Sequence, residues 1–262
     1  MSVLEAIILG IVQGLTEFLP VSSSGHLELG KALLGVEEGL LFSIAVHGAT
    51  ALSTIIAFWK DILDILTGLL KFKWNEELRF VLLIVVSMIP VGIVGDFLES
   101  EIEAFVDGRI RFVGFMLLIT AGLLYLTERV QVVDGAKVSF KNALLIGVAQ
   151  AMAVLPGISR SGATISTALL LKIDRFNAAR FSFLMVIPPI LGANLLKMIE
   201  LSKGDAQVEN ISVAALTAGS IAALIVGYLA CKWMIHIVRK SKLHWFSIYC
   251  VIVGLIAIFL GS

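Results

Sequence analysis

Charged residues are scarce in this sequence, where Asp, Glu, Lys and Arg together fill 15% of the 262 positions. A soluble domain carries about a quarter charged residues, so this content excludes an ordinary soluble protein. The formal net charge is +0, which gives no electrostatic reason to expect a nucleic-acid partner. What is abundant is apolar, because hydrophobic residues make up 58% of the chain and the mean hydropathy is +0.99.

Several apolar runs approach the length of about 20 residues that a helix needs to cross the hydrocarbon core of a bilayer. They cover residues 80–97, 112–126, 213–233 and 245–260. The sequence therefore predicts an all-α polytopic membrane protein.

Cysteine is also nearly absent. Cys231 and Cys250 are the two cysteines and both fall in apolar segments, which excludes a disulfide framework or a cysteine metal site. The first segment lacks a basic start and a small-residue cleavage site, and it carries Glu5 and Glu17. We therefore expect it to belong to the mature fold and not to be a cleaved signal peptide.

The apolar pattern predicts ten helical segments. They cover about residues 3–19, 23–35, 40–59, 80–98, 111–127, 140–155, 160–172, 177–199, 212–234 and 244–261. Pro20 and Pro156, with nearby glycines, separate the first two segments and the sixth from the seventh. These paired segments are short and polar where they join, which favours re-entrant hairpins over full membrane spans.

The two interrupted pairs are similar in sequence. Residues 8–26 read ILGIVQGLTEFLPVSSSGH and residues 145–163 read LIGVAQAMAVLPGISRSGA, with Gly, Gln, Leu-Pro and Ser-Gly in the same order. We interpret them as parts of an internal repeat rather than a chance similarity. A single membrane domain, 1–262, then contains repeat one at about 1–130 and repeat two at about 138–262.

Each repeat would hold one hairpin and three spans. A hairpin returns to the side that it entered from, whereas three spans end on the opposite side. The second repeat must therefore be upside down relative to the first. The sequence predicts an inverted-topology repeat with six transmembrane helices and two re-entrant helical hairpins, whose joints meet near the midplane of the membrane.

Basic residues predict the orientation in the membrane. One side of the predicted topology holds Lys60, Lys71, Lys73, Arg79, Arg129, Lys137, Lys141, Lys172, Arg175, Arg180, Arg239, Lys240 and Lys242. The other side holds Arg109 and Lys203 among acidic loops with Glu99, Glu101, Glu103, Asp107, Glu200, Asp205 and Glu209. Because cytoplasmic loops are rich in Lys and Arg, we expect both termini and the opening of the active site on the outer face.

The two hairpin joints carry residues suited to bind an anion. Hydroxyl groups come from Ser22, Ser23, Ser24, Ser159, Ser161 and Thr164, and close backbone approach is allowed by Gly25, Gly157 and Gly162. Each joint precedes a helix N-terminus, where free N–H groups and the positive dipole end attract anions. Helix capping accounts for one serine per helix but not for Arg160, whose guanidinium fits phosphate oxygens. The alternative role for Arg160 is a structural ion pair.

Gln13 and Glu17 lie four residues apart, so they share one helix face just before the first joint. With phosphate nearby, we expect Glu17 to hold a divalent metal ion, Mg²⁺ or Ca²⁺, because both prefer oxygen ligands. The alternative is a structural pair between Glu17 and Arg160.

The histidines offer a general base. His26 follows the three serines and is expected to share one pocket with Arg160, where it can take a serine proton while Glu17 orients its ring. The alternative for His26 is a packing role. His47 either lines the cavity or packs among apolar neighbours, and Lys197 is expected to reach the membrane surface rather than the site.

Taken together, QGLTE (13–17), LPVSSSGH (19–26) and LPGISRSGAT (155–164) resemble the signatures of the undecaprenyl-pyrophosphate phosphatase family, the bacitracin-resistance type. The resemblance extends along nearly the whole chain. It implies that Ser23 is the nucleophile, His26 the catalytic histidine and Arg160 the phosphate-binding arginine. The alternative for Ser23 is a binding role, with direct attack by water. By the same resemblance, Gln13 and Glu17 fill the acidic motif, and the phosphate pocket includes Ser22, Ser159, Ser161 and Thr164. Gln13 stands where many members have Glu. An amide cannot serve as a base or a strong metal ligand, so Glu17 is expected to carry more of both roles.

The resemblance also implies an activity and a location. The expected enzyme is a multi-pass hydrolase of the plasma (inner) membrane that converts undecaprenyl pyrophosphate to the monophosphate, and so recycles the carrier lipid for peptidoglycan and confers bacitracin resistance. Its expected partners are the polyprenyl pyrophosphate substrate and membrane lipid, with no nucleic acid, while a homodimer stays open. The alternative is a transporter or flippase of a polyprenyl phosphate lipid that uses the same midplane site.

Overall fold

The computed structural model describes residues 1–36, 39–106, 109–203 and 211–261, and it describes the backbone alone at 32, 96–106 and 260. Asp107, Asp205 and Glu209 of the predicted acidic loops lie outside the described residues.

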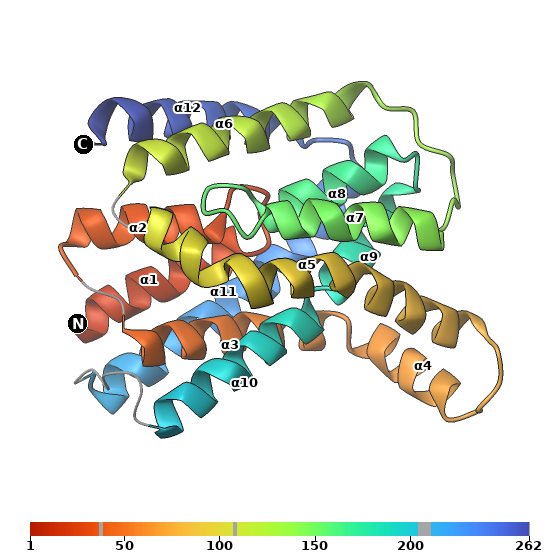
Figure 1. The fold of residues 1–262 in the computed structure, drawn as a ribbon, viewed down its shortest axis with the longest axis horizontal. Coiled ribbons are helices and arrows are strands. Elements are labelled where there is room, and N and C mark those ends of the chain that lie inside the picture. Colours follow the sequence, from red (N-terminus) through yellow and green to blue (C-terminus); the bar gives the residue numbers. More distant parts are fainter. Residues whose placement is uncertain (37–38, 107–108, 204–210, 262) are drawn as a thin grey trace.

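The described residues are almost wholly helical, which confirms the predicted all-α class (Figure 1). The α-helices are α1 (Val3–Thr16), α2 (Ser23–Leu34), α3 (Leu40–Ala57), α4 (Trp59–Leu69), α5 (Glu76–Val106), α6 (Ile110–Leu126), α7 (Phe140–Met152), α8 (Arg160–Leu170), α9 (Arg175–Leu184), α10 (Ile187–Lys203), α11 (Val213–Arg239) and α12 (His244–Leu260). A short 3-10 helix, η1 (Thr127–Arg129), follows α6.

Within the described part of the chain, five helical stretches are long and apolar enough to cross a membrane. They are Leu40–Ala57, Glu76–Gly95, Ile110–Arg129, Arg175–Lys203 and Val213–Arg239. The helices α1 and α12 are apolar as well but shorter. These lengths support the multi-pass membrane protein that the composition predicts.

Serine and glycine define several helix ends. The Ser2 hydroxyl accepts a hydrogen bond from the Glu5 N–H at 3.3 Å, and the Glu5 carboxylate accepts one from the Ser2 N–H at 2.7 Å. This reciprocal pair is a capping box that fixes the start of α1. The side chains of Ser139 and Ser212 cap α7 and α11, and α2 stops at Gly35, which has a left-handed φ of 64°.

The structure contains a helix, α4, that the apolar pattern does not predict. Lys60, Asp61 and Asp64 interrupt the hydrophobic run there, so the segment reads as a polar connection between spans. It instead forms an amphipathic helix that packs on α5, with Ile62 and Ile65 partly buried against the main core.

The prediction of one continuous helix at 177–199 is wrong, because the structure divides this segment into α9 and α10. The two helices are separated by a turn at Met185 and Val186, just before Pro188 and Pro189. Proline lacks a backbone N–H and its ring clashes with the preceding turn, which disfavours one helix through this point.

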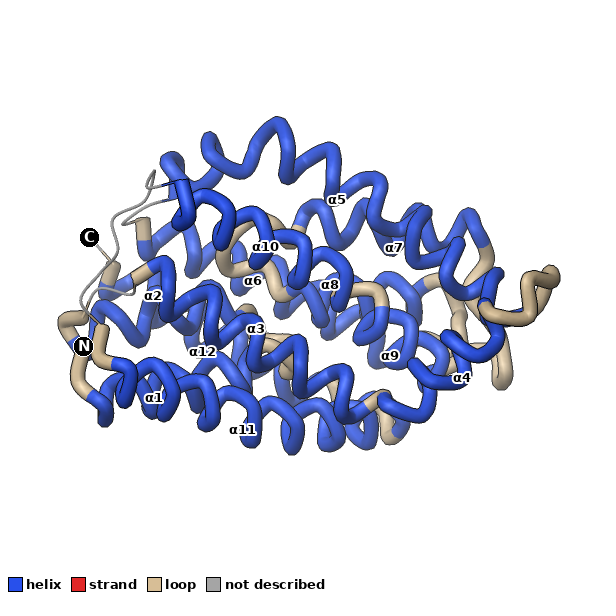
Figure 2. Tube along the Cα trace, turned by 90° about the horizontal axis from the view of Figure 1, so that it is seen from below, coloured by secondary structure: helices blue, strands red, loops and turns tan. Residues whose placement is uncertain are grey.

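Two helical hairpins start from opposite ends of the molecule and meet near its middle (Figure 1). One consists of α1 and α2, and the other of α7 and α8. The long helices surround them, with α1 packed along α11, α7 along α5, and α6 along α12. Both termini lie at one end of the molecule and α4 lies at the other (Figure 2).

Gly10 and Gly147, which match in the two sequence repeats, lie at equivalent helix crossings. A Cβ atom on Gly10 would overlap the carbonyl oxygen of Gly219 in α11, and one on Gly147 would overlap that of Ser87 in α5. The missing side chains therefore let α1 and α7 approach their partner helices backbone to backbone.

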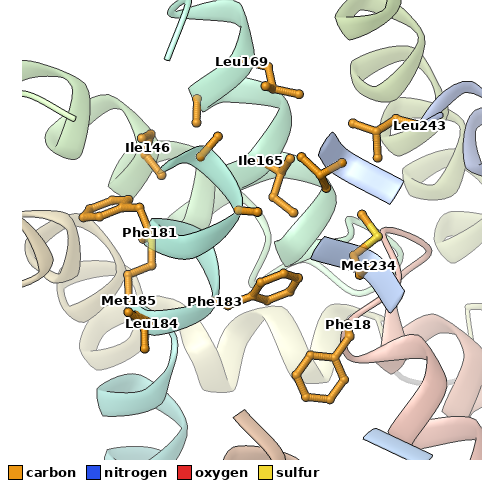
Figure 3. Packing of buried hydrophobic residues seen from close by; sticks show 14 of the residues in the cluster. Phe18, Ile146, Ile165, Leu169, Phe181, Phe183, Leu184, Met185, Met234 and Leu243 are labelled. Atoms are coloured by element: carbon orange, nitrogen blue, oxygen red, sulfur yellow. The ribbon is translucent and has the colours of Figure 1, made fainter. Parts of the chain in front are cut away.

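The main hydrophobic core holds the end of α1 in place. Phe18 packs beside Phe183, with ring centroids 6.0 Å apart (Figure 3). Phe183 in turn contacts Phe58, with ring centroids 6.1 Å apart. Both Phe18 and Phe183 are almost fully buried. Because Phe18 directly follows Glu17, this packing fixes the position of that carboxylate.

Candidate active site

The two hairpin joints are in direct contact. The Ser22 hydroxyl of the first joint accepts hydrogen bonds from the Gly157 N–H of the second joint at 3.1 Å and from the Gly25 N–H at 3.3 Å. The Ser161 hydroxyl of the second joint donates to the Leu19 carbonyl at 3.2 Å. Segments some 140 positions apart in the chain thus form one polar centre, as the repeat predicts.

Unusual backbone conformations make this contact possible. Gly157 has a φ of 98°, which a residue with a side chain rarely adopts, and a Cβ atom there would lie 2.5 Å from the Val113 carbonyl oxygen. Ser22 has a left-handed φ of 70° despite its side chain. Its hydroxyl bonds to the Gly25 and Gly157 N–H groups and also contacts the Ser24 hydroxyl at 3.3 Å, which offsets that strain.

Thr120 of α6 braces the second joint. Its hydroxyl donates to the Gly157 carbonyl at 3.1 Å and accepts from the Ser159 N–H at 3.0 Å. The Ser159 side chain then caps α8 by accepting from the Gly162 N–H at 3.1 Å. Ser159 and Gly162 therefore shape the joint, and they leave the first residue of α8, Arg160, at the helix N-terminus.

Glu17 is the centre of the polar network. Its Oε2 accepts hydrogen bonds from the Ser23 hydroxyl at 2.7 Å and from the Gln13 amide at 3.2 Å, while its Oε1 pairs with the guanidinium of Arg160. The Glu17 side chain is only 4% exposed, so its charge depends on these partners. The ion pair that the sequence leaves as an alternative is formed, and it joins the two repeats.

A cavity of about 290 Å³ lies over this network. Its polar lining consists of Glu17, Ser22, Ser23, Ser24, Ser43, His47, Gln150, Arg160, Asn194 and Lys197. A much smaller pocket shares Glu17 and Arg160 and includes Ser161 and Thr164. Most of the predicted hydroxyl groups therefore do gather around Arg160.

His26 does not join them in the way that the sequence predicts. One ring nitrogen, Nδ1, lies 2.8 Å from the Ser22 carbonyl oxygen, and the other, Nε2, lies 2.8 Å from the hydroxyl of Tyr249 in α12. A carbonyl only accepts, so Nδ1 carries the proton and Nε2 accepts from Tyr249. His26 is not among the residues that line the cavity with Arg160, and the Ser23 hydroxyl donates to Glu17 instead.

Comparison with known proteins identifies the family. The family model described as "Bacitracin resistance protein BacA" matches residues 6–256 of this chain. The chain belongs to the BacA family. A protein of Christiangramia forsetii named undecaprenyl-diphosphatase is 57% identical over 262 residues, which cover 98% of each chain.

Two further relatives carry the same name. The one from Bacteroides thetaiotaomicron is 54% identical over 260 residues and 98% of each chain. The one from Methanosphaera stadtmanae is 42% identical over 278 residues, which cover 100% of this chain and 99% of that one. The resemblance that the sequence motifs carry is thereby confirmed over the full length of this BacA-family chain.

A divalent ion fits this site only when it is shared with a ligand. Among the described residues, no group of three or more His, Cys, Asp or Glu side chains could hold a metal by itself. Glu17 offers a carboxylate, and the buried Gln13 Oε1 beside it has no hydrogen-bond partner among the described atoms. Mg²⁺ commonly binds through one or two carboxylates together with phosphate oxygens, and Ca²⁺ also accepts amide oxygens.

Sequence reasoning misses several residues of this BacA-family site. Gln150, Asn194 and Lys197 line the cavity from α7 and α10, and Lys197 does so although a surface position is expected for it. Thr120 and Tyr249 support the joints from α6 and α12. Only Gln150 carries a detectable signal, because it matches Gln13 in the repeat.

Proposed function

We propose that this chain removes the terminal phosphate from undecaprenyl diphosphate, leaving undecaprenyl phosphate and inorganic phosphate. The observation that carries this proposal is the hydrogen bond between Ser23 and Glu17 beside Arg160, at the contact of the two hairpin joints. Family membership and the name of the relatives agree with it. The same activity fits recycling of a carrier lipid for peptidoglycan and resistance to bacitracin.

Phosphate binding is the first task of the site. Arg160 supplies a charge and a planar fork of donors, and the N-termini of α2 and α8 add backbone donors and positive dipole ends. An incoming phosphate competes with Glu17 for Arg160. Once Arg160 turns to the phosphate, the Glu17 carboxylate is free to accept a proton.

Ser23 then attacks the terminal phosphorus while Glu17 accepts its hydroxyl proton, across the existing 2.7 Å hydrogen bond. A bond forms between Ser23 Oγ and phosphorus, and the bond from phosphorus to the bridging oxygen breaks, releasing the lipid monophosphate. Water subsequently hydrolyses the phosphoserine, and Glu17 returns the proton to Ser23. This assignment gives Glu17 the role of base that the sequence gives to His26, which in its present position anchors the first joint to Tyr249.

Glu17 and the Gln13 amide oxygen are the groups that would hold Mg²⁺ or Ca²⁺ together with the phosphate oxygens. Such an ion supplies neutralisation of the charge on the phosphates. Removal of divalent ions by a chelator is therefore expected to suppress turnover, and either ion should restore it.

The membrane arrangement belongs to the same proposal. Six spans and two re-entrant hairpins, in an inverted repeat, are supported by the equivalent crossings of α1 with α11 and of α7 with α5. Both termini lie at one end of the molecule, and most basic loops lie at the other end, near α4. The cavity over Ser23 is lined by Ser43 and His47 in the first half of α3, which starts at the end of the molecule that holds both termini. This position supports an opening on the outer face.

Phosphate release from undecaprenyl diphosphate by the purified protein in detergent tests this proposal. A phosphatase releases inorganic phosphate in proportion to enzyme, whereas a transporter or flippase with the same site releases none. The Ser24→Ala variant is a matched control for Ser23→Ala, because both serines line the cavity but Ser23 alone of the two donates to Glu17. Absence of phosphate release from the wild-type protein in the presence of Mg²⁺ and Ca²⁺ would contradict the proposal.

A further inference from the structure

Gln150 is a buried polar side chain whose amide is unpaired within the described part of the chain. It lies near the end of α7, is only 2% exposed, and lines the cavity over Ser23. Neither its Oε1 nor its Nε2 has a hydrogen-bond partner among the described atoms. A buried amide that lacks hydrogen bonds is destabilising, so a ligand in the cavity that completes its hydrogen bonding would bind favourably there.

Lys197 and Asn194 reach the same cavity from α10. The side of the cavity that α10 forms is called its wall here. Ile190 lines both the cavity and the small pocket beside Arg160, so it marks the end of this wall that is nearest to Arg160, the inner end. Lys197 follows Ile190 by seven residues, which corresponds to about 10 Å along a helix. Lys197 therefore lies farther from Arg160 along the wall, toward the end of α10.

The charged side chains that line the cavity carry a net positive charge, because one ion pair and one further cation are present. Glu17 and Arg160 neutralise each other, because they are bonded in the same network. Lys197 is the remaining Lys or Arg among the described residues that line the cavity. A ligand with two phosphate groups thus meets one cation at the inner end of the wall and a second one farther out.

We infer that Lys197 and Gln150, with Asn194, form a second phosphate subsite for the phosphate that stays on the lipid after hydrolysis. This inference rests on the proposed function and specifies how the diphosphate is recognised. The inner subsite at Arg160 and Ser23 holds the terminal phosphate, and the outer subsite holds the phosphate that carries the lipid chain.

The chemistry gives the outer subsite a definite role. When the bond to the terminal phosphorus breaks, negative charge develops on the bridging oxygen of the departing lipid monophosphate. An ammonium group and an amide N–H donor next to that phosphate stabilise this charge. The subsite also distinguishes a diphosphate from a monophosphate, because a lone phosphate group cannot occupy both positions.

The variants Lys197→Met and Gln150→Met test this subsite, with Lys203→Met as the matched control on α10. Lys203 is exposed and is not among the residues that line the cavity. We expect both test variants to raise the KM for polyprenyl diphosphate and the inhibition constant of the polyprenyl monophosphate product by about tenfold, as for one lost charge-assisted hydrogen bond. Inhibition by inorganic phosphate, which needs only the inner subsite, should change by less than about twofold.

A second measurement does not depend on turnover. Polyprenyl monophosphate should raise the thermal unfolding temperature of the wild-type protein and of Lys203→Met. The rise should be much smaller for Lys197→Met. The inference is overturned if Lys197→Met and Gln150→Met match the wild type in both measurements. It is also overturned if they weaken inhibition by inorganic phosphate as much as inhibition by polyprenyl monophosphate. Failure of the proposed function would look different, because the wild-type protein itself would then release no phosphate.

Discussion

Ser23 differs from its neighbouring serines in what its hydroxyl contacts. It donates to Glu17 Oε2 at 2.7 Å, whereas the Ser22 hydroxyl accepts from two backbone N–H groups that hold the joints together. Ser24 lies in the cavity and contacts Ser22 at 3.3 Å. Three adjacent serines thus have different contacts, and the proposed mechanism makes Ser23 the reactive one.

We predict that Ser23→Ala lowers kcat by at least about 10²-fold, because the substitution removes the nucleophile that Glu17 activates. The measurement is phosphate release under saturating lipid, accompanied by a search for phosphoserine after rapid acid quenching. Ser24→Ala should retain activity within about tenfold. A Ser23→Ala protein with wild-type kcat would show that water attacks directly.

The local motifs allow much of the site to be predicted from sequence. Glu17, Ser23 and Arg160 stand beside the two proline breaks, where polar residues in an apolar chain are conspicuous. The direction of His26 does not follow from its motif, because Tyr249 lies 223 positions away and binds the imidazole only after α12 has packed. Lys197 likewise resembles an interfacial residue until the packing of α10 turns it into the cavity.

At the scale of helices, glycine controls how closely the elements approach. A Cβ on Gly10 or Gly147 overlaps a carbonyl oxygen of the neighbouring helix, and backbone atoms cannot move aside as a flexible side chain can. By contrast, a Cβ on Gly92 in α5 meets nothing within 4 Å.

We therefore predict that Gly147→Ala lowers the thermal unfolding temperature in detergent, through overpacking that costs about 1–3 kcal/mol. Gly92→Ala is the matched control and should be neutral or slightly stabilising, because alanine is the better helix former. Equal unfolding temperatures for the two variants would contradict the close crossing of α7 and α5.

The number and type of most helices follow from the apolar pattern, and the two hairpins follow from the positions of proline and glycine. Two features of the fold do not follow. The charged residues of α4 make an amphipathic helix look like a polar connection. Pro188 and Pro189 break a segment that is mostly apolar on both sides of them. A hydropathy profile contains neither the packing energy of an amphipathic helix nor the backbone restriction that proline imposes.

For the whole molecule, the account predicts a definite orientation in the membrane. Cys231 and Cys250 are buried, so they can be replaced by alanine to provide a background without reactive thiols. In that background, Lys242→Cys should react with a membrane-impermeant maleimide only after the cells are permeabilised, whereas Lys203→Cys should react in intact cells. The reverse pattern would place the cavity opening in the cytoplasm.

The repeats matter for function because neither one contains the complete site. The first repeat supplies Glu17 and Ser23, and the second supplies Arg160. A variant at Arg160 leaves Glu17 buried without its cation, which costs about 3–5 kcal/mol when a buried pair is broken. The double variant Glu17→Gln, Arg160→Gln removes that charge as well, so a higher thermal unfolding temperature than that of Arg160→Gln alone would show that the unpaired carboxylate destabilises the single variant.

The most direct measurement of the central claim is phosphate release by purified Arg160→Gln protein, compared with Arg180→Gln. Arg180 is also ion-paired, to Asp61 at 2.6 Å, but it is not among the residues that line the cavity over Ser23. The account predicts that Arg160→Gln loses at least about 10²-fold in kcat/KM while Arg180→Gln stays within about tenfold of the wild type. Wild-type phosphate release by folded Arg160→Gln protein would contradict a single site shared by the two hairpin joints.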